Sequence, residues 1–401
     1  MKQSVGYGWV IVAAMFFMQT VSSGLGFYNM SVYMAEFART LQVPLAQASF
    51  AVTLFFLVGG VAGMQIARLM ERVHVRWIVV CAALLAGASL SSVALATELW
   101  HIYVLFILYG IGYTGTSLVV ATTLVTQWFP GPKRSVALST ASTGLSFGGV
   151  IVTPATAYLF NSFGASATLP WLGLAYAGLI VPLGIWVIRP APTPAVRVGL
   201  PAGGDWSYAK AIRTRFFILL STGYVFAQGS QVGGISHLYN RVTEMADFTV
   251  AATAVQVLTI CSIAGRFAGG WLVMYIPIRP FTLANLGLQM VGLLAIALAE
   301  NPIAIWLGAG LFGASVGNVL MLQPLWLAEA FPSDIYPRVF ALGNAATLLG
   351  VALGPFVMGA AYDAAGYTVS YAVAMCLCGL ALLIVAAAGA RPLAPVVAQS
   401  S

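Results

Sequence analysis

Charged side chains are the scarcest feature of this sequence, since Asp, Glu, Lys and Arg make up only 7% of its 401 residues. A soluble domain carries about 25% charged residues, so the composition argues against a soluble globular protein. Hydrophobic residues reach 60%. They group into runs of about 18–25 residues, which are long enough to cross the hydrocarbon core of a bilayer as helices. The sequence therefore predicts an all-α polytopic membrane protein.

Residue types that build metal sites and catalytic sites are also rare, with only four cysteines and three histidines. The cysteines all fall inside predicted membrane spans, and Cys376 and Cys378 point to nearly opposite faces of one helix. No nucleophile–base pair, metal-ligand cluster or phosphate-binding loop is visible in the sequence. We therefore expect no enzymatic activity and no cofactor, which leaves a membrane enzyme or a transporter-like sensor as minor alternatives.

Apolar runs separated by charged or Pro/Gly-containing breaks predict twelve transmembrane helices. The predicted spans are 7–30, 47–69, 77–97, 101–126, 134–160, 168–188, 215–239, 250–274, 280–299, 302–328, 338–361 and 367–389. The longest polar stretch lies between the sixth and seventh spans. We therefore expect an N-terminal six-helix bundle over 1–188, a cytoplasmic linker over 189–214 and a C-terminal six-helix bundle over 215–401.

The basic residues indicate the orientation of the chain. Nearly all Lys and Arg residues fall in the loops on one side of the predicted spans, whereas Arg39 and Arg241 fall on the other side. The positive-inside rule then predicts that both termini are cytoplasmic. This distribution explains the net charge of +7 without nucleic-acid binding, and it predicts a multi-pass protein of the cell (inner) membrane.

The two predicted bundles share internal repeats. The segment WFPGPKRSVALSTASTG begins at Trp128 and FPSDIYPRVFALGNAATLLG begins at Phe331, and Arg134 corresponds to Arg338, 204 positions later. A second pair, starting at Ala62 and Ala264, has nearly the same spacing. Duplicated halves of this kind occur in secondary transporters, in which the substrate binds near the bilayer midplane between the repeats.

Over its whole length the sequence resembles the major facilitator superfamily. The segment ARLMERVHVR, from Ala67 to Arg76, is a degenerate form of that superfamily's motif G-x-L-x-D-R-x-G-x-R between spans 2 and 3. The resemblance implies the fold of that superfamily, with two pseudo-symmetric six-helix bundles.

A narrower resemblance is to monocarboxylate transporters and their oxalate/formate-antiporter relatives. YGWVIVAAMFF from Tyr7 is similar to their first span, and WFPGPKRSVALSTASTGLSFGG from Trp128 is similar to their entry to span 5. The group carries a substrate-binding arginine at the position of Arg266. The Asp that proton-coupled carriers place one turn earlier is Ser262 here, and Tyr28 stands where they place a Lys. The resemblance therefore implies an anion site, and one fixed cation suits a monoanion better than a dianion.

Arg266 is a candidate ligand for that anion on physical grounds as well. It lies inside a predicted span, and no Asp or Glu lies inside a neighbouring apolar run at comparable depth. An Arg cannot lose its proton, and a charge at a helix centre costs about 2.5–3.5 kcal/mol on insertion scales. Gly265 and Gly269 would clear space beside it for a cavity. The alternative is a structural arginine that extends its side chain to the membrane surface.

Polar and aromatic stripes on spans 1, 4, 7 and 11 are candidates for lining the same cavity. Hydrogen bonding between packed helices would produce similar stripes, so that alternative stays open for each residue. His237 is also a candidate for proton coupling because its pKa range suits proton transfer. The candidate substrate-binding residues are Arg266, Tyr28, Asn29, Tyr113, Thr116, Gln228, Gln231, His237, Asn344 and Thr347.

A second group of charged residues falls at the cytoplasmic ends of the predicted spans. An ion-pair latch among them would stabilise an outward-facing state, and the alternative is that they are solvated loop charges. The candidate gating residues are Glu71, Arg72, Arg76, Arg134, Glu329 and Arg338.

These features together predict a secondary active transporter that moves a small organic monocarboxylate anion by alternating access. We expect proton symport or anion exchange, so the partners are the anion, protons and the lipid bilayer, and the protein is expected to be a monomer. The alternative within transport is an exporter of amphipathic or drug-like compounds. Such exporters carry a Gly-Pro motif in span 5, whereas this sequence has Gly354-Pro355 in span 11.

Overall fold

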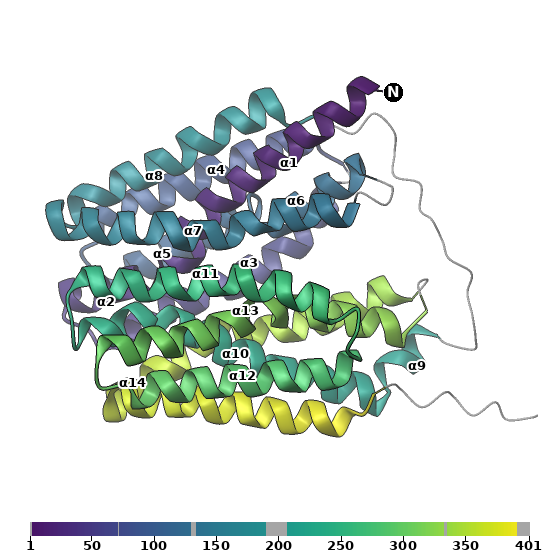
Figure 1. Ribbon diagram of the computed structural model, residues 1–401. Coiled ribbons are helices and arrows are strands. Elements are labelled where there is room, and N and C mark those ends of the chain that lie inside the picture. Colours follow the sequence, from purple (N-terminus) through teal and green to yellow (C-terminus); the bar gives the residue numbers. More distant parts are fainter. Residues whose placement is uncertain (1, 71, 130–133, 190–206, 333–334, 391–401) are drawn as a thin grey trace, which may run out of the picture.

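The computed structural model describes residues 2–70, 72–129, 134–189, 207–332 and 335–390, and every regular element in these ranges is a helix (Figure 1). The N-terminal bundle contains α1 (Lys2–Ser23), η1 (Gly24–Tyr28), α2 (Met30–Leu41), α3 (Leu45–Leu69), α4 (Val75–Ser92), η2 (Val93–Leu95), α5 (Leu99–Thr114), α6 (Leu118–Trp128), α7 (Arg134–Phe163), α8 (Ala165–Pro182) and η3 (Leu183–Val187). The C-terminal bundle contains α10 (Arg215–Thr243), α11 (Phe248–Leu272), α12 (Ile278–Leu298), α13 (Pro302–Ala330) and α14 (Tyr336–Ala388). A short helix, α9 (Tyr208–Ile212), precedes the second bundle.

Ten stretches of the described chain are long and apolar enough to cross a membrane. The last of them, Arg338–Ala388, contains two helices, because α14 breaks at Ala365 and Gly366, where Gly366 has a φ of 78°. A left-handed backbone of this kind favours glycine. α10 adds a further crossing of 29 residues, whose polar side chains lower its hydropathy but are mostly buried between other helices. These helices account for the twelve predicted spans.

The structure corrects the predicted boundaries in two places. The first span does not end at residue 30, because the chain passes through the π-helical turn η1 and continues as α2 to Leu41. The fourth predicted span, 101–126, is divided between α5 and α6 at Gly115 to Ser117. The prediction missed both features because only a few small and polar residues interrupt the hydrophobic run at each break, too few to end a predicted span. The helix α9 in the predicted linker was not expected.

Equivalent contacts recur in the two bundles and confirm the repeat. A Cβ atom on Gly110 of α5 would meet the carbonyl oxygen of Phe55, and one on Gly313 of α13 would meet that of Leu258. Both residues of the second contact follow those of the first by 203 positions. Small residues allow helices to approach this closely. The two bundles therefore share one internal packing scheme.

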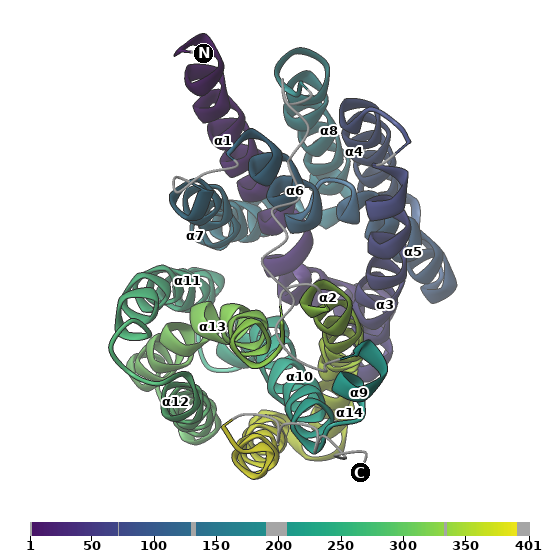
Figure 2. The same cartoon turned by 90° about the vertical axis from the view of Figure 1, so that its right-hand side faces the viewer.

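The first and last described residues of the chain lie with α9 at one end of the molecule, here called the terminal side (Figures 1 and 2). The opposite end, here called the far side, contains the α2–α3 and α10–α11 connections. The bundles meet along two seams, α3 with α14 and α7 with α11, and α2 also packs against α10.

On the far side the bundles are joined by direct bonds. The carboxylate of Asp363 accepts hydrogen bonds from the backbone N–H groups of Leu45 and Ala46, at 3.0 and 2.8 Å. Next to this cap, the rings of Phe50 and Phe356 have centroids 5.7 Å apart. The far side is therefore closed.

The direct bonds between the bundles end before the helices reach the terminal side. The bond from Arg266 to Ser142 and the contact of Gly60 with Leu348 mark how far this joining extends toward the terminal side. No hydrogen bond among the described residues joins the bundles beyond these positions. Figure 1 shows the ribbons of the two bundles farther apart at the terminal side than at the far side. The molecule is thus closed at one end and diverges toward the other.

Candidate functional site

Arg266 lies in α11 where the bundles begin to diverge. Its side chain is partly buried, and Nη1 donates to the carbonyl oxygen of Ser142 in α7, at 3.1 Å. The ion pairs of the described residues, Glu36–Arg39 and Arg241–Glu244, both lie on the far side. Within the described chain the guanidinium therefore bonds across the seam to a neutral carbonyl and to no carboxylate.

The glycines beside Arg266 have a different role from the one predicted. A Cβ on Gly265 would meet the backbone of Ala314, and one on Gly269 would meet the amide of Asn318. Both partners belong to α13. These glycines therefore allow α11 and α13 to pack closely and do not open a cavity, so their signal in the sequence was one of helix packing.

Tyr28 reaches the same seam from the first span. It ends the π-helical turn η1, is almost fully buried, and lies near Arg266. A Cβ on Gly149 of α7 would lie 2.9 Å from the Tyr28 ring and would also meet Thr259 of α11. Tyr28 is therefore held between α7 and α11 by the absence of a side chain at Gly149. π-Helical turns of this kind occur frequently at functional sites.

Asn29 follows Tyr28 and is oriented by a neighbouring helix. Its Nδ2 donates to Oγ1 of Thr156 at 2.7 Å, and its buried Oδ1 has no partner. The hydroxyl of Ser262 is likewise buried without a partner, and that of Ser146 lies beside the Tyr28 hydroxyl. Ser146 lies one turn from Ser142, the carbonyl partner of Arg266. The sequence did not single out Ser146, which was concealed in a run of small residues.

Tyr113 and Thr116, the two candidates of the fourth predicted span, differ in whether their side chains are already hydrogen-bonded within the bundle. Tyr113 is partly buried, and its ring packs 5.0 Å from that of Phe55 and against Gly26 of the first span. Thr116 is fully buried, and its hydroxyl is 2.6 Å from Tyr176 and 3.1 Å from Ser22. The Thr116 hydroxyl is thus already bonded within the N-terminal bundle, whereas Tyr113 remains at the edge of the first span.

Gln228 and Gln231 lie in the buried middle of α10. Each amide oxygen is buried without a hydrogen-bond partner. The neighbouring Gly229 packs against Gly350 of α14, and Ala227 accepts a bond from Gln289 of α12. Both glutamines are thus buried polar groups, and their contact with a ligand stays a prediction.

His237 is not brought together with Arg266. Its Nε2 is 2.9 Å from the carbonyl oxygen of Pro355 and 3.5 Å from the hydroxyl of Ser49. It lies six residues before Thr243, and Arg266 lies eighteen residues after Phe248, both counted from the far side. At the helical rise of 1.5 Å per residue, the two differ in depth by about 18 Å. His237 therefore belongs to the closed far side.

The candidates on α14 also differ from one another. Asn344 is exposed, one turn before Leu348, which contacts Gly60 of α3. Thr347 is buried and donates to Gln323 at 3.3 Å and to the carbonyl oxygen of Gly343 at 2.9 Å. Asn344 thus faces the diverging part of the α3–α14 seam, and Thr347 is bonded inside its own bundle.

The predicted gating residues lie on the terminal side. Arg72, Arg76, Glu329 and Arg338 are exposed; Glu71 and the side chain of Arg134 lie outside the described residues. The Arg338 guanidinium lies 4.7 Å from the ring centroid of Tyr208. None of these exposed charges forms an ion pair among the described residues, which agrees with the separation of the bundles here.

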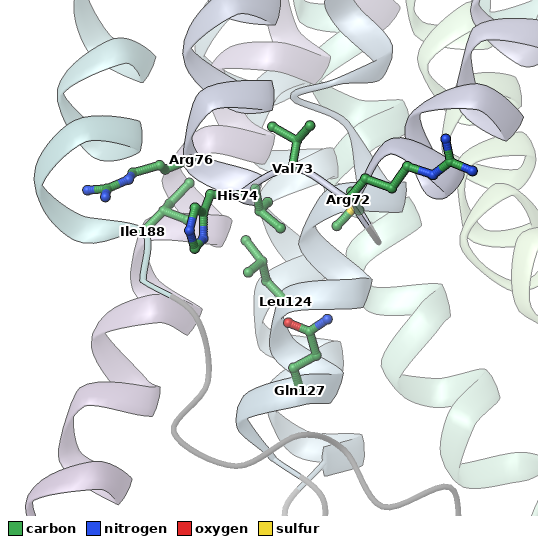
Figure 3. A pocket seen from close by; sticks show the side chains of 9 residues that line it. Arg72, Val73, His74, Arg76, Leu124, Gln127 and Ile188 are labelled. Carbon is green, nitrogen blue, oxygen red and sulfur yellow. The ribbon is translucent and has the colours of Figure 1, made fainter.

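Figure 3 shows a cavity of about 320 Å³ beside the basic loop between α3 and α4. Arg72 and Arg76 point away from each other, while His74 and Gln127 face the space between the loop and α6. The cavity therefore lies within the N-terminal bundle and is distinct from the region around Arg266.

Known proteins resemble this chain in both sequence and fold. It is 25% identical over 349 residues to the "Probable nitrate/nitrite transporter NarK2" of Mycobacterium tuberculosis, covering 82% of this chain and 83% of the relative. It is 24% identical over 309 residues to monocarboxylate transporter 13 of Rattus norvegicus, covering 75% and 68%. A crystal structure of a bacterial homologue of the human lysosomal transporter Spinster superimposes with a TM-score of 0.72 at 16% identity, covering 95% of each chain.

The family assignment depends on a sequence profile that spans most of the chain. The profile of the Major Facilitator Superfamily matches residues 16–328. This range includes all of the N-terminal bundle after the start of α1, and the C-terminal bundle through most of α13. The paired bundles and the recurring contacts agree with that match, and the chain is a membrane transporter of the Major Facilitator Superfamily.

Proposed function

We propose that this transporter carries a small organic monocarboxylate whose negative charge is bound by Arg266. The observation that supports this most directly is the guanidinium at the point where the bundles diverge, with a backbone carbonyl as its bonded partner. Charge-assisted hydrogen bonds from Arg to a carboxylate are stronger than a bond to a neutral carbonyl, and they are often bidentate. An entering carboxylate would therefore replace a weak partner with a strong one.

The surrounding polar groups would orient the rest of the substrate. Tyr28 and Asn29 on the first span and Gln228 and Gln231 on α10 are buried and lie on opposite bundles. Their unpartnered oxygens, on Asn29 and the two glutamines, can accept hydrogen bonds from a hydroxyl or a protonated carboxyl group. Tyr113 adds an aromatic wall. Thr116, Thr347 and His237 support the neighbouring helices in this proposal and do not contact the substrate.

Transport would follow from rocking of the two bundles about this site. The structure corresponds to a state closed at the far side. If both termini are cytoplasmic, as the basic residues predict, this state faces inward. In the opposite state the terminal side would close, and the charges at Arg72, Arg76, Glu329 and Arg338 would then come close enough to form a latch. The proposal includes a monomer in the cell (inner) membrane that works by proton symport or anion exchange.

The relatives support a monovalent anion but favour two chemistries. The names of the relatives indicate nitrate or nitrite for one and monocarboxylates for the other. Nitrate and a carboxylate are both small, planar and monovalent, so one arginine can hold either. Transport of an inorganic anion is therefore the second candidate function, favoured by a match that covers 82% of this chain.

Arg266→Ala tests the proposal. In proteoliposomes that contain the full chain, we expect uptake of labelled butyrate or lactate to fall about 10- to 100-fold, as for the loss of hydrogen bonds to a charged group. Arg279→Ala is a matched control, because Arg279 is also partly buried in the C-terminal bundle and donates one hydrogen bond to a backbone carbonyl, that of Ala386, at 2.9 Å. It lies outside both seams.

Two outcomes would contradict the proposal. If Arg266→Ala transports these anions normally, the arginine is structural and the amphipathic-compound exporter becomes the better candidate. If the wild type moves nitrate and ignores every monocarboxylate in the same assay, the inorganic anion replaces the organic one. Competition between labelled butyrate and unlabelled nitrate, measured on one preparation, separates the two substrates directly.

A further inference from the structure

The two seams pair their residues in the same register. In the α3–α14 seam, Ser49 meets Gly359 and Gly60 meets Leu348. In the α7–α11 seam, Gly149 meets Thr259, and Ser142 meets Arg266. In all four pairs the two residue numbers add to 408, as expected for antiparallel helices in one repeated arrangement. Continuing the α3–α14 seam by one turn places Met64 opposite Asn344.

Met64 lies at the same depth as Arg266. It follows the far-side start of α3 at Leu45 by nineteen residues, and Arg266 follows the far-side start of α11 at Phe248 by eighteen. At 1.5 Å per residue both lie about 27–28 Å from the far side. Because these helices begin 203 positions apart, the repeat aligns Arg266 with Gly63 and its neighbour Met64.

Of these two positions, only Met64 carries a side chain, and it lies next to the α3–α14 seam. A Cβ on Gly63 would lie 3.2 Å from the Thr114 side chain, so this position packs against α5. Met64 lies one turn after Gly60 on the stripe that meets α14, and its side chain is 50% exposed. Asn344, opposite it, is exposed as well. Met64 therefore occupies the level of the candidate site on the α3–α14 seam.

The candidate site is consequently different on its two sides. The α7–α11 seam supplies a guanidinium, and at the same depth the α3–α14 seam supplies a thioether. Figure 2 shows α11 and α3 on opposite sides of the molecule. The next residue on the Met64 stripe is Arg68. It is exposed and lies about 6 Å closer to the terminal side than Met64. This second cation lies at the mouth of the diverging region rather than at the level of Arg266.

We infer that Met64 is a specificity-determining residue that contacts the hydrocarbon part of a monocarboxylate bound to Arg266. This inference rests on the proposed function. A flexible, polarizable methionine adapts to apolar groups of different shape. A second carboxylate directed toward Met64 would lose hydration without gaining a counter-charge. The site should therefore favour alkyl monocarboxylates over dicarboxylates and over nitrate, which has no apolar part.

The test compares ligand selectivity in the full-length wild type and in Met64→Arg, Met64→Ala and Met64→Leu. The probes are acetate, butyrate, hexanoate, succinate and nitrate, each used to compete with labelled butyrate. For the wild type we expect affinity to rise about two- to fourfold for each added methylene. The upper value corresponds to the full free energy of burying one such group. Met64→Leu, which keeps an apolar side chain of similar size, should preserve this series.

Met64→Arg should shift the preference toward succinate and nitrate relative to hexanoate by about tenfold or more, because it adds a cation on the second side. Met64→Ala should flatten the chain-length series and leave acetate affinity unchanged. If both variants keep the wild-type selectivity, the inference is wrong. If Met64→Arg cannot be purified, an unchanged chain-length series in Met64→Ala alone is sufficient to overturn it.

The same data distinguish this inference from the proposed function. Loss of all anion binding in Arg266→Ala, together with unchanged selectivity in the Met64 variants, leaves the proposed function standing and removes the role of Met64. Normal butyrate binding in Arg266→Ala removes both. An Arg68→Ala variant serves as a control for nonspecific electrostatics, because it removes a cation from the same stripe and should leave the chain-length series intact.

Discussion

Tyr28 is the residue through which the first span reaches the α7–α11 seam. Its ring lies against Gly149, and it is near Arg266. Tyr28→Phe keeps the ring and removes only the hydroxyl. If that hydroxyl donates to a bound carboxylate, we expect anion affinity to fall about tenfold, as for one hydrogen bond to a charged group. Competition binding on purified protein measures this change.

The matched control for Tyr28→Phe is Tyr371→Phe. Tyr371 is also fully buried, and its hydroxyl donates to the carbonyl oxygen of Gly234 at 2.7 Å, inside the C-terminal bundle. Its loss should lower thermal stability and leave anion affinity nearly unchanged. Equal anion affinity in Tyr28→Phe and the wild type would show that the Tyr28 hydroxyl does not contact the substrate.

At the scale of single residues, the sequence identified Arg266 because a charge inside an apolar run is costly and therefore stands out. A hydrophobic residue at the same position would not. Stripes of polar residues carried less information. The hydroxyl of Thr116 bonds to Tyr176, and that of Thr347 bonds to Gln323. These partners lie on other helices, so helical periodicity alone gives the direction of a side chain but not whether its hydrogen bonds are already satisfied. Whether the candidates bind substrate stays a prediction.

Among the elements, α3 is unusual because the other bundle caps its N-terminus. The Asp363 carboxylate accepts from two backbone N–H groups at the start of α3. Removal of an N-cap costs about 0.5–2 kcal/mol. We expect Asp363→Ala to shift the population toward the state open at the far side by about 2- to 30-fold. Labelling of Ser49→Cys, a position fully buried in the closed seam, with a membrane-impermeant maleimide would report this shift.

Asp247→Ala is the control for this prediction. Asp247 caps its own helix, α11, by accepting from the N–H groups of Thr249 and Val250. Its loss removes a comparable cap without touching the other bundle, so labelling at position 49 should stay at the wild-type rate. Equal labelling in the Asp363 and Asp247 variants would mean that the inter-bundle cap does not hold the far side closed.

The existence and order of the helices followed from hydrophobic run length, because bilayer thickness imposes a minimum length on every span. The breaks inside the first and fourth predicted spans did not follow from run length. The π-helical turn at Gly24–Tyr28 and the break after Thr114 lie where a few small and polar residues interrupt the apolar runs, too briefly to end a predicted span. At both places glycines pack closely inside the N-terminal bundle, Gly24 against α7 and Gly115 against α4, so contacts between helices, and not hydropathy, determine them.

For the whole molecule, the repeated register of the seams implies a specific pair of cross-linkable positions. A Cβ on Gly359 would lie 3.1 Å from the Cβ of Ser49, somewhat shorter than the usual separation in a disulfide. The double variant Ser49→Cys with Gly359→Cys should therefore cross-link in the state that the structure represents, after small adjustments. The four native cysteines, Cys81, Cys261, Cys376 and Cys378, are replaced beforehand.

Closing the far side covalently should stop transport, because alternating access requires this side to open. We expect butyrate uptake by proteoliposomes to fall to background under oxidising conditions and to recover when a reductant is added. The contrasting pair, Met64→Cys with Asn344→Cys, lies in the same seam on the diverging terminal side, and it should cross-link only after the bundles have rocked to the opposite state. Rapid cross-linking of both pairs in the absence of substrate would contradict a rigid rocking motion. Full uptake with the 49–359 bridge formed would show that transport does not require the far side to open along the α3–α14 seam.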